Sequence, residues 1–448
     1  MPKLKIAVVG SGISGLSCAW GLSQRHDVTL IEADNRIGGH AHTVNVQTEN
    51  GTLAVDTGFI VFNSWTYPNF TAMMDYLDQA VTPTQMSFAV TADDGRYEYS
   101  GNSLGTLLGT ARQWLSPAHW RMMLDLLRFY RKAESHVPMV REGTSLGKYL
   151  SDFGYGEHFI QRHILPMSGA IWSATPDQIA AYPFHAFIRF FSNHRLFNLG
   201  NRPDWHTVTG GSREYVTKLI DDSRFTSRVS SPVEKLERHR DRAHLHFADG
   251  SDESFDQVVL ATHADTAYQI LAKPTALEHE LLSVFKTSAN TVYLHRDKTL
   301  MPKHRRFWSG WNYRLQNSTV PTTPEVTYWM NALQKLVSNE DHFVSLNPVV
   351  KPDAKLTDGV YSYHHPLFND ATLTAQKQLW SLQGVDRVWY CGAWFGAGFH
   401  EDGLQAGLAV AEQLGGVRRP WSVDNESSRI HLHDAPQTFP DALAEAAE

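Results

Sequence analysis

The chain has 448 residues and a formal net charge of −7, with 42% hydrophobic and 19% charged residues. This length exceeds one ordinary hydrophobic core, so we expect at least two domains, and the mild negative charge gives no reason to expect a nucleic-acid partner. The sequence has no run of about 18 apolar residues that would span a membrane, and its first residues lack the apolar core of a secretory signal.

Only two cysteines are present, Cys18 and Cys391, and they lie far apart in the sequence. They form neither a disulfide framework nor a cysteine-rich zinc pattern. A reducing compartment is the simplest interpretation, and we therefore expect a cytoplasmic protein.

The first predicted unit is a strand, a glycine-rich turn, a helix and a second strand. Residues 6–9 form a β-branched apolar run, and residues 16–22 repeat apolar side chains at helical spacing. Residues 28–31 form the second strand, which ends at Glu32. This order is the context in which a GxGxxG turn indicates a dinucleotide-binding fold.

Each glycine of the turn meets a need of that fold. Gly10 permits the tight turn, Gly12 lets the backbone approach a pyrophosphate, and Gly15 lets the helix pack closely on the strand. The following helix directs its positive N-terminus at the phosphates. Glu32 lies about 20 residues further on and can accept the ribose hydroxyls, which favours FAD or NAD over NADP.

The next residues distinguish FAD from NAD. The segment EADNRIGGHAHT, residues 32–43, resembles the extended fingerprint of the flavin-dependent amine oxidase and phytoene desaturase superfamily. In that superfamily the arginine and the two following glycines lie along the FAD pyrophosphate and ribityl chain. The resemblance implies these roles for Arg36, Gly38 and Gly39. The alternative is a surface turn with an exposed arginine.

Further blocks continue the resemblance through the middle of the chain. VDTGFIVFN, residues 55–63, resembles the glycine-containing loop near the isoalloxazine, and WHTVTGGSREYV, residues 205–216, resembles the segment that returns the chain to the flavin domain. The resemblance implies that the backbone at Val233 contacts the adenine. It also implies that Ala261 and Thr262, at the end of a predicted strand, lie near the nucleotide.

The segment 112–132 lies within residues 103–137, which are predicted to form two helices that divide near Ser116 and Pro117. In the second helix an apolar stripe is flanked by basic residues. The stripe consists of Trp120, Met123, Leu124 and Leu127, and the basic residues are Arg121, Arg128, Arg131 and Lys132. One interpretation is a helix that faces the core and has a solvated side. The other is a basic amphipathic helix that lies on a membrane surface beside a substrate entrance.

Two stretches are predicted to build a pocket for a hydrophobic substrate. Residues 162–205 are apolar and aromatic, as expected for helices that line a cavity. Residues 291–302 and 326–336 alternate like strands of an antiparallel sheet. Candidate lining residues on this sheet are Tyr293, His295, Tyr328, Trp329 and Asn331, although ordinary sheet packing explains each one individually. No histidines show zinc-site spacing, so we expect no metal.

The block CGAWFGAGFHEDGLQAG, residues 391–407, follows a predicted strand at 388–391 and precedes a helix predicted from Gly403 onward. It resembles the closing block of the superfamily, in which the helix N-terminus points at the flavin N1–C2=O edge and stabilises the anionic reduced ring. We expect Asp402 to be the N-cap, and Leu404 and Gln405 to offer backbone N–H groups to the ring.

His400 is expected beside the flavin ring and is a candidate catalytic residue, together with His295. Adjacent His, Glu and Asp side chains cannot converge on one ion from a strand or a helix, so a metal site at residues 400–402 is disfavoured. Covalent flavin is also disfavoured, because Cys391 precedes Gly392 rather than standing in a loop beside the ring. We therefore predict noncovalent FAD.

The full predicted FAD-binding set gathers these blocks. It comprises Gly10, Ser11, Gly12, Ile13, Ser14, Gly15, Glu32, Ala33, Arg36, Gly38, Gly39, His40, Gly58, Phe59, Val233, Ala261, Thr262, Gly392, Phe399, Glu401, Asp402, Gly403, Leu404 and Gln405.

The predicted fold class is α/β. A Rossmann-like FAD-binding domain of the GR2 type is built from residues 1–65, 205–265 and 385–420. A discontinuous α+β substrate-binding domain with an antiparallel sheet takes residues 66–204 and 266–384, and residues 421–448 form a C-terminal tail. The sequence leaves the oligomeric state open.

More narrowly, the chain resembles a bacterial group of predicted NAD/FAD-binding proteins often encoded beside cyclopropane-fatty-acid-synthase-like enzymes. This neighbourhood implies a fatty-acyl substrate that is desaturated, saturated or isomerised by hydride transfer to flavin N5. Two alternatives stay open. One is a flavin amine oxidase, and the other is a noncatalytic flavin-binding partner of a lipid-modifying enzyme.

Overall fold

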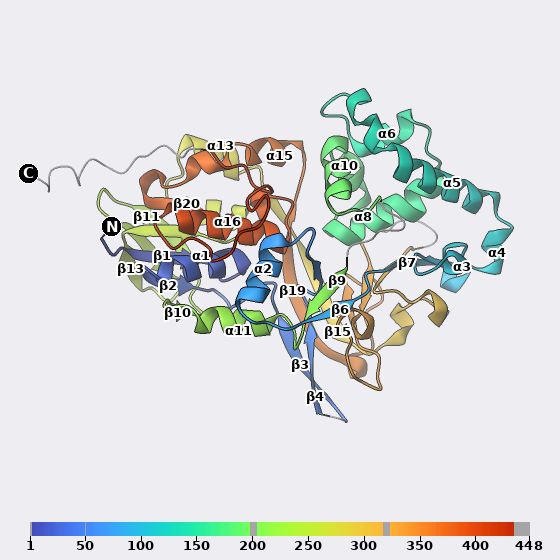
Figure 1. Cartoon of the computed structure of the whole chain (residues 1–448), viewed down its shortest axis with the longest axis horizontal. Coiled ribbons are helices and arrows are strands. Elements are labelled where there is room, and N and C mark those ends of the chain that lie inside the picture. Colours follow the sequence, from blue (N-terminus) through green and yellow to red (C-terminus); the bar gives the residue numbers. More distant parts are fainter. Residues whose placement is uncertain (1, 50, 198–203, 317–322, 434–448) are drawn as a thin grey trace, which may run out of the picture.

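The computed structural model describes residues 2–49, 51–197, 204–316 and 323–433. Two parts lie side by side in Figure 1. We call the part around the five-stranded sheet the dinucleotide half, and the part with the seven-stranded sheet and helices α3 to α10 the distal half. Both the N-terminus and the last described residues lie on the dinucleotide half (Figure 1).

A parallel sheet forms the centre of the dinucleotide half, and its strands come from three separate stretches of the chain. Their order is β10 (Thr226–Arg228), β2 (Asp27–Ile31), β1 (Lys5–Val9), β14 (Gln257–Leu260) and β20 (Val388–Tyr390). Neighbouring strands are parallel throughout, and Val8 in β1 lies between Leu30 and Val259. The predicted Rossmann-like α/β fold is confirmed.

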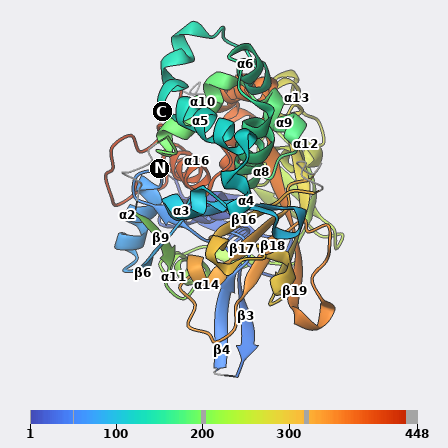
Figure 2. The same cartoon turned by 90° about the vertical axis from the view of Figure 1, so that its right-hand side faces the viewer.

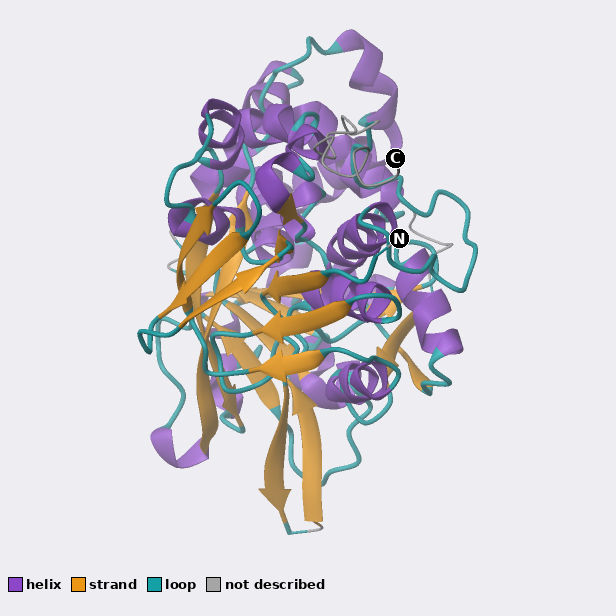
Figure 3. Ribbon diagram, turned by 90° about the vertical axis from the view of Figure 1, so that its left-hand side faces the viewer, coloured by secondary structure: helices purple, strands orange, loops and turns teal. Residues whose placement is uncertain are grey.

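Smaller elements complete the dinucleotide half. An antiparallel sheet contains β11 (Val233–Arg238), β12 (Ala243–Phe247) and β13 (Asp252–Phe255), with a hairpin turn at residues 248–251. The helices of the dinucleotide half besides α1 and α16 are α2 (Pro68–Tyr76), α11 (Arg213–Asp221), α12 (Ala264–Ile270), α13 (Ala276–Leu282) and α15 (Asp370–Gln376). The hairpin of β3 (Thr43–Thr48) and β4 (Gly51–Asp56) extends away from the body (Figures 1 and 3).

The distal half combines a mixed sheet with a helical layer above it, as Figure 2 shows. The sheet order is β19 (Thr357–Leu367), β15 (Lys286–His295), β18 (Phe343–Leu346), β17 (Val326–Trp329), β16 (Trp311–Arg314), β7 (Phe88–Ala92) and β8 (Tyr97–Ser100). Only the pairing of β16 with β7 is parallel. A third small sheet joins β5 (Phe62–Asn63), β9 (Trp205–Val208) and β6 (Val81–Thr84).

The helices of the distal half follow one another between residues 104 and 193. They are α3 (Leu104–Leu107), α4 (Ala111–Trp114), α5 (Pro117–Lys132), α6 (Leu146–Asp152), α7 (Glu157–Phe159), α8 (Leu165–Trp172), α9 (Pro176–Ala181) and α10 (Phe184–Asn193). None of the helices in the described ranges has both the length and the apolar character needed to cross a membrane.

Three predicted element assignments change in the structure. The strand predicted over residues 291–302 ends at His295, and residues 298–300 form a 3₁₀ turn. The strand predicted over residues 326–336 ends at Trp329, and residues 330–333 form the short helix α14 (Met330–Leu333). The last helix, α16 (His400–Gln413), begins three residues before the predicted Gly403. The cause is a capping interaction, in which the Asp402 carboxylate accepts a hydrogen bond from the Phe399 N–H at 2.8 Å.

Small residues let α16 cross closely over α1 (Ile13–Ser23). A Cβ atom on Gly407 would lie 2.1 Å from the carbonyl oxygen of Ser14, and one on Gly21 would lie 3.1 Å from Ala411. The hydroxyl of Ser14 donates to the carbonyl of Gly403 at 2.6 Å. The two helices therefore pack through backbone contacts that no larger side chain permits.

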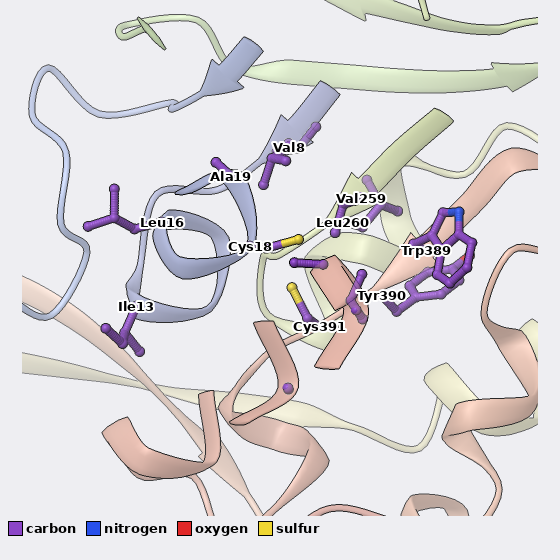
Figure 4. Close-up of a cluster of buried hydrophobic side chains, with 14 of the residues drawn as sticks. Val8, Ile13, Leu16, Cys18, Ala19, Val259, Leu260, Trp389, Tyr390 and Cys391 are labelled. Carbon is purple, nitrogen blue, oxygen red and sulfur yellow. The ribbon is translucent and has the colours of Figure 1, made fainter. Parts of the chain in front are cut away.

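The two cysteines meet in the core beneath these helices. Cys18 on α1 and Cys391 after β20 are both buried and free, and their sulfur atoms face each other in Figure 4. Burial raises the pKa of the Cys18 thiol, and a hydrogen bond with Cys391 adds to the shift. Neither sulfur is therefore a surface nucleophile.

The described part of the predicted C-terminal tail packs back onto the dinucleotide half. Trp421 stacks on Trp20 with ring centroids 5.8 Å apart, and Arg429 pairs with Asp402 at 3.2 Å. Residues 434–448 of the predicted tail lie outside the described residues.

Candidate functional site

The glycine-rich turn after β1 forms an open cradle at the N-terminus of α1. Gly10 has φ +100°, and a Cβ there would lie 2.8 Å from the carbonyl oxygen of Ala261. A Cβ on Gly15 would lie 1.8 Å from the Gly10 oxygen, whereas one on Gly12 would meet nothing within 4 Å. No side chain caps α1. Its free N–H groups therefore face open space, the arrangement that binds phosphate.

Glu32 stands beside this cradle at the end of β2. Its carboxylate accepts hydrogen bonds from the backbone N–H of Ser11 at 2.8 Å and from the Ser11 hydroxyl at 2.5 Å. The N–H of Asp34 donates to the other oxygen at 2.9 Å. These bonds fix the carboxylate next to the turn, where it remains able to accept ribose hydroxyls.

The second glycine pair closes the other side of the cradle. A Cβ on Gly39 would lie 2.8 Å from the Cα of Gly12, and Gly38 donates its N–H to the carbonyl of Ser11 at 3.1 Å. Two polar atoms here are buried without a hydrogen-bond partner in the described structure, Nη1 of Arg36 and Nε2 of His40. An unpaired buried guanidinium nitrogen indicates a missing anionic ligand.

These observations test whether FAD fits the chain. Open space at Gly12, an uncapped helix N-terminus and the unpaired Arg36 nitrogen suit a pyrophosphate, and the adjacent Glu32 carboxylate suits the adenosine ribose. Residues larger than glycine do not fit at positions 10, 15 and 39, because a Cβ atom there would lie too close to backbone atoms. The residues present therefore fit the group that the sequence predicts.

The N-terminus of α16 lies beside the same cradle. A Cβ on Gly403 would lie 2.9 Å from Cγ2 of Ile13. Because the helix begins at His400, Asp402 is its third residue and Phe399 is the N-cap, so the predicted N-cap role of Asp402 is wrong. The N–H groups without intrahelical acceptors then belong to residues 399–402, and those of Leu404 and Gln405 lie in the following turn.

Glu401 has a structural position at the same helix end. Its buried carboxylate accepts from the N–H of Asn69 at 3.1 Å, from the Asn69 side chain at 2.8 Å and from the N–H of Phe70 at 2.9 Å. These groups belong to the first turn of α2, so Glu401 joins α16 to α2. Among the described residues no cluster of His, Cys, Asp or Glu has the geometry of a metal site.

The candidate catalytic residue His400 packs inside the dinucleotide half. Its ring stacks on Phe59 with centroids 3.8 Å apart, and its Nε2 lies 2.6 Å from the hydroxyl of Tyr215. Burial lowers the pKa of His400 to about 3, so the ring is neutral near pH 7. These contacts give His400 a positioning role for the closing loop.

The structure does not bring His295, the second candidate, to this site. His295 ends β15, where it contacts the Ser345 hydroxyl at 2.8 Å. The opposite end of β15 adjoins the dinucleotide half, where Ser288 pairs with His365. Seven residues of extended strand separate Ser288 from His295, which is about 23 Å. This placement does not support the catalytic role of His295, which stays a prediction.

The remaining sheet candidates, Tyr293, Tyr328, Trp329 and Asn331, are not among the lining residues of the apolar cavity described below. The indole N–H of Trp329 donates to Asp341 at 3.1 Å, and the amide of Asn331 donates to the carbonyl of Glu340 at 2.9 Å. Tyr328 packs edge-on against Trp311. These contacts are ordinary sheet and loop packing.

A histidine and tyrosine cluster at the junction of the two halves was not predicted as a group. The ring of His40 lies 5.1 Å from Tyr363, 5.4 Å from His365 and 6.4 Å from His263. Burial lowers the pKa of His365 to about 4 and holds that of His40 well below its ordinary value. No spacing in the sequence could indicate this cluster, because β19 joins the loop at residues 38–42 only in the folded chain.

The other predicted cofactor residues surround this junction. A Cβ on Gly58 would lie 2.3 Å from the carbonyl oxygen of His40. Trp394, two residues after Gly392, donates its indole N–H to the carbonyl of Thr262 at 3.0 Å. Phe399 points toward the distal half, where it stacks with Phe190 at 5.3 Å. Ala33 is exposed, and Val233 is partly buried at the start of β11.

A cavity of about 280 Å³ lies between the halves. Its wall comes from α8, α9, the start of β15 and the end of β19. The lining residues are Trp172, Ala174, Gln178, Ile179, Ala181, Tyr182, Val284, Lys286, Pro366, Leu367, Phe368 and Asn369. A Cβ on Gly398, two residues before α16, would lie 3.0 Å from Phe368 and 3.1 Å from Pro366. The cavity therefore adjoins the closing loop of the cofactor site.

Comparison with known proteins is consistent with this geometry. A family model described as flavin containing amine oxidoreductase matches residues 13–327. Similar solved structures include a CLA-producing fatty acid isomerase from P. acnes, with 14% identity over 92% of this chain and 98% of that chain and a TM-score of 0.63. A cyclohexylamine oxidase from Brevibacterium oxydans IH-35A has 15% identity over 92% and 100%, with a TM-score of 0.63.

A putrescine oxidase in complex with putrescine is a third similar structure. It has 13% identity over 92% of this chain and 99% of that chain, with a TM-score of 0.63. At these identities the structural matches establish a shared fold.

Proposed function

We propose that the substrate of this chain, which belongs to the flavin-containing amine oxidoreductase family, is an apolar molecule of the fatty-acyl class. The chain is an FAD-dependent oxidoreductase. The bound flavin supplies the redox chemistry, in which a hydride is accepted or returned at N5. The protein contributes the binding, orientation and exclusion of water described below.

The cavity beside the closing loop is the observation that carries the proposal. Large apolar side chains form most of its wall, including Trp172, Ile179 and Phe368. An acyl chain gains about 0.8 kcal/mol for each methylene group buried in such a wall. The aromatic rings also exclude water from the side of the closing loop, which protects a hydride transfer from solvent.

The charge in the cavity discriminates between substrate classes. Lys286 is the only ionisable side chain other than Tyr182 among the described lining residues, and none of them is Asp or Glu. An ammonium group on the wall repels a protonated amine and attracts a carboxylate. The cavity therefore favours a neutral or anionic apolar substrate, such as a fatty acid, over an alkylammonium ion.

The histidine and tyrosine cluster at the junction has a supporting role. Its imidazoles are neutral near pH 7, so they donate and accept hydrogen bonds without adding charge beside the flavin site. Tyr363 fixes the cluster, because its hydroxyl lies 2.7 Å from Nδ1 of His42 and 2.7 Å from the hydroxyl of Thr57. Nε2 of His40 remains free to contact the cofactor.

Amine oxidation is the second candidate function. Two of the similar structures are oxidases whose names specify amines. In this chain Trp172 and Tyr182 stack with centroids 5.2 Å apart and both line the cavity, so an aromatic wall is present for a neutral amine. The described lining residues include no carboxylate, so a charged amine would find no counterion in the cavity.

Product analysis tests the proposal. We would incubate the FAD-loaded protein with linoleic acid and, separately, with cyclohexylamine, and analyse both mixtures for oxidised or isomerised products by mass spectrometry and conjugated-diene absorbance. We expect altered double bonds in the fatty acid and no imine from the amine. Product from the amine alone would contradict the proposal, and so would the absence of product from both.

A variant pair tests the contribution of the cavity charge. Lys286→Met should raise KM for the fatty acid about threefold, the size of an exposed ion pair, with little change in kcat. The matched control is Lys355→Met, because Lys355 is exposed and distant from the cavity lining. Equal KM values for the two variants would remove Lys286 from substrate binding.

A further inference from the structure

A second cavity, of about 500 Å³, is lined in part by α4, and Figure 1 shows α4 at the end of the distal half farthest from the five-stranded sheet. Its described lining is polar and rich in arginine. The lining residues are Asp93, Asp94, Arg96, Tyr97, Arg112, Gln113, Ser116, His158 and Arg162. Three guanidinium groups face two carboxylates, so the cavity carries net positive charge. Neither the flavin site nor the apolar cavity uses these residues.

Buried polar groups in this lining lack partners. Nη1 of Arg162 and Nε2 of His158 are buried without a hydrogen-bond partner among the described residues. The Arg162 guanidinium lies over the ring of Tyr97, 4.1 Å from its centroid, which holds it in place. Arg162 belongs to a π-helical turn at residues 160–164, a distortion that often marks functional sites. The cavity is thus prepared for an anion that accepts from both groups.

Exposed apolar side chains lie on α3, α4 and α5 and on the turn between α4 and α5, which also supplies lining residues of this cavity. We call them the apolar rim: Leu104, Trp114, Leu115, Trp120 and Leu124, which are 81%, 53%, 87%, 47% and 63% exposed. Trp114 and Leu115 stand between the lining residues Gln113 and Ser116 in the sequence. Trp120 donates its indole N–H to the carbonyl of Trp114 at 2.9 Å, which keeps the rim contiguous. Exposed apolar patches of this kind mark interaction surfaces.

Helix α5 leaves this rim outside the core, contrary to the predicted stripe. The residues that face the core are Met122, Leu126, Phe129 and, of the predicted stripe, Met123, whereas Trp120 and Leu124 are exposed. Two of the predicted solvated arginines, Arg121 and Arg128, pair with Asp125 at 3.2 and 3.1 Å. Arg131 and Lys132, in the last turn of α5, stay exposed, and the other arginines near the rim are those of the cavity.

We propose that this end of the distal half docks on an anionic phospholipid bilayer, with the apolar rim at the acyl boundary and a headgroup phosphate in the arginine cavity. Tryptophan and leucine side chains favour the interfacial region, and the planar guanidinium fork matches phosphate oxygens. Stable peripheral binding requires two signals, and the rim and the cavity supply one each. A soluble phosphate ester would occupy the cavity but would leave five apolar side chains in water.

Vesicle co-sedimentation tests the proposal with the FAD-loaded full chain. The vesicles are phosphatidylcholine alone, and phosphatidylcholine with about one third phosphatidylglycerol. We expect binding to the anionic vesicles that weakens with added salt, and little binding to phosphatidylcholine alone. Arg112→Gln should reduce partitioning about fivefold, the usual contribution of one arginine at such a surface. Leu115→Ser should reduce it by a similar factor at either salt concentration.

Matched controls separate docking from general effects. Arg240→Gln and Val350→Ser change exposed residues of the same types outside the rim and the cavity, and both should bind vesicles like the wild type. Flavin content should be unchanged in all four variants, which distinguishes this test from failure of the proposed function.

Three outcomes would overturn the proposal. The first is no binding to anionic vesicles, and the second is binding that neither Arg112→Gln nor Leu115→Ser weakens. The third is stabilisation by glycerol 1-phosphate in a thermal shift assay without vesicle binding, which would assign the cavity to a soluble phosphate ester.

Discussion

The dinucleotide half and the distal half pack their cores in opposite ways. In the dinucleotide half, α1 and α16 cross through Gly21, Gly403 and Gly407, and backbone atoms meet at van der Waals distance. In the distal half large rings fill the space, as where Tyr149 stacks on Phe184 at 4.0 Å and Phe187 on Phe191 at 4.3 Å. The first half depends on the absence of side chains and the second on their shape, so they should respond differently to substitution.

The largest expected effect is from Gly407→Val at the α1–α16 crossing. A side chain there meets the Ser14 carbonyl oxygen and the Ser17 hydroxyl. The helices must separate, which costs about 3 kcal/mol of folding stability and opens the flavin cradle. We expect loss of bound flavin and a lower Tm by circular dichroism. The control Gly105→Ala, in α3 of the distal half, has space and should keep both.

Next in size is Glu32→Ala, which leaves the packing intact. Removing charge-assisted hydrogen bonds at the ribose should weaken FAD binding by about 2 kcal/mol, or roughly thirtyfold, measured by fluorescence titration of the apoprotein. The exposed Glu142→Ala in the distal half serves as the control. An unchanged Kd for Glu32→Ala would remove the ribose role of this carboxylate.

The third prediction concerns pH. Burial lowers the pKa of His400 from its ordinary 6.5 to about 3, so the folded state prefers the neutral ring. Its contribution to stability is fully present above pH 6.5. As the pH falls from 6.5 toward 3, this contribution is lost at about 1.4 kcal/mol per unit.

In urea unfolding, the free energy of unfolding of His400→Gln should therefore fall less steeply than that of the wild type as the pH is lowered from 6.5 toward 3; this falling part of the curve is the acid limb. The exposed His239→Gln is the matched control and should keep the wild-type limb. Parallel acid limbs for wild type and His400→Gln would show that His400 titrates normally and is not buried as described.

The smallest expected effect is from Leu124→Ser on α5 of the distal half. This side chain is 63% exposed, so the free energy of unfolding should change by no more than about 0.5 kcal/mol. On the same helix, Met122→Ala should cost about 2 to 5 kcal/mol because Met122 is fully buried. If Leu124→Ser and Met122→Ala lowered the free energy of unfolding equally, Leu124 and the predicted stripe would face the core instead.

The sequence predicted the dinucleotide half well, because its determinants are local. Gly10, Gly12 and Gly15 act through backbone geometry within one turn, and Glu32 lies at a fixed spacing from them. The strands predicted at residues 6–9 and 28–31 have the same local origin. The start of α16 was misplaced by three residues, because the capping interaction of Asp402 is decided by side-chain geometry.

The sequence predicted the distal half and the junction less well, because contacts across long separations determine them. Tyr363 and His365 reach His40 only after β19 has paired with β15. On α5 the helical spacing of apolar residues allows two different faces to point toward the core, and the structure buries the face that contains Leu126. The resemblance predicts that His400 lies beside the flavin ring. It does not predict the contacts of His400 with Phe59 and Tyr215, which are far from it in the sequence.

Flavin absorbance after anaerobic mixing is the most direct test of the central claim. The FAD-loaded protein is mixed with linoleic acid and, in parallel, with cyclohexylamine, and the visible flavin bands are followed in a stopped-flow instrument. The account predicts bleaching or a perturbed flavin spectrum with the fatty acid and an unchanged spectrum with the amine. Bleaching by the amine, with no response to the fatty acid, would contradict it.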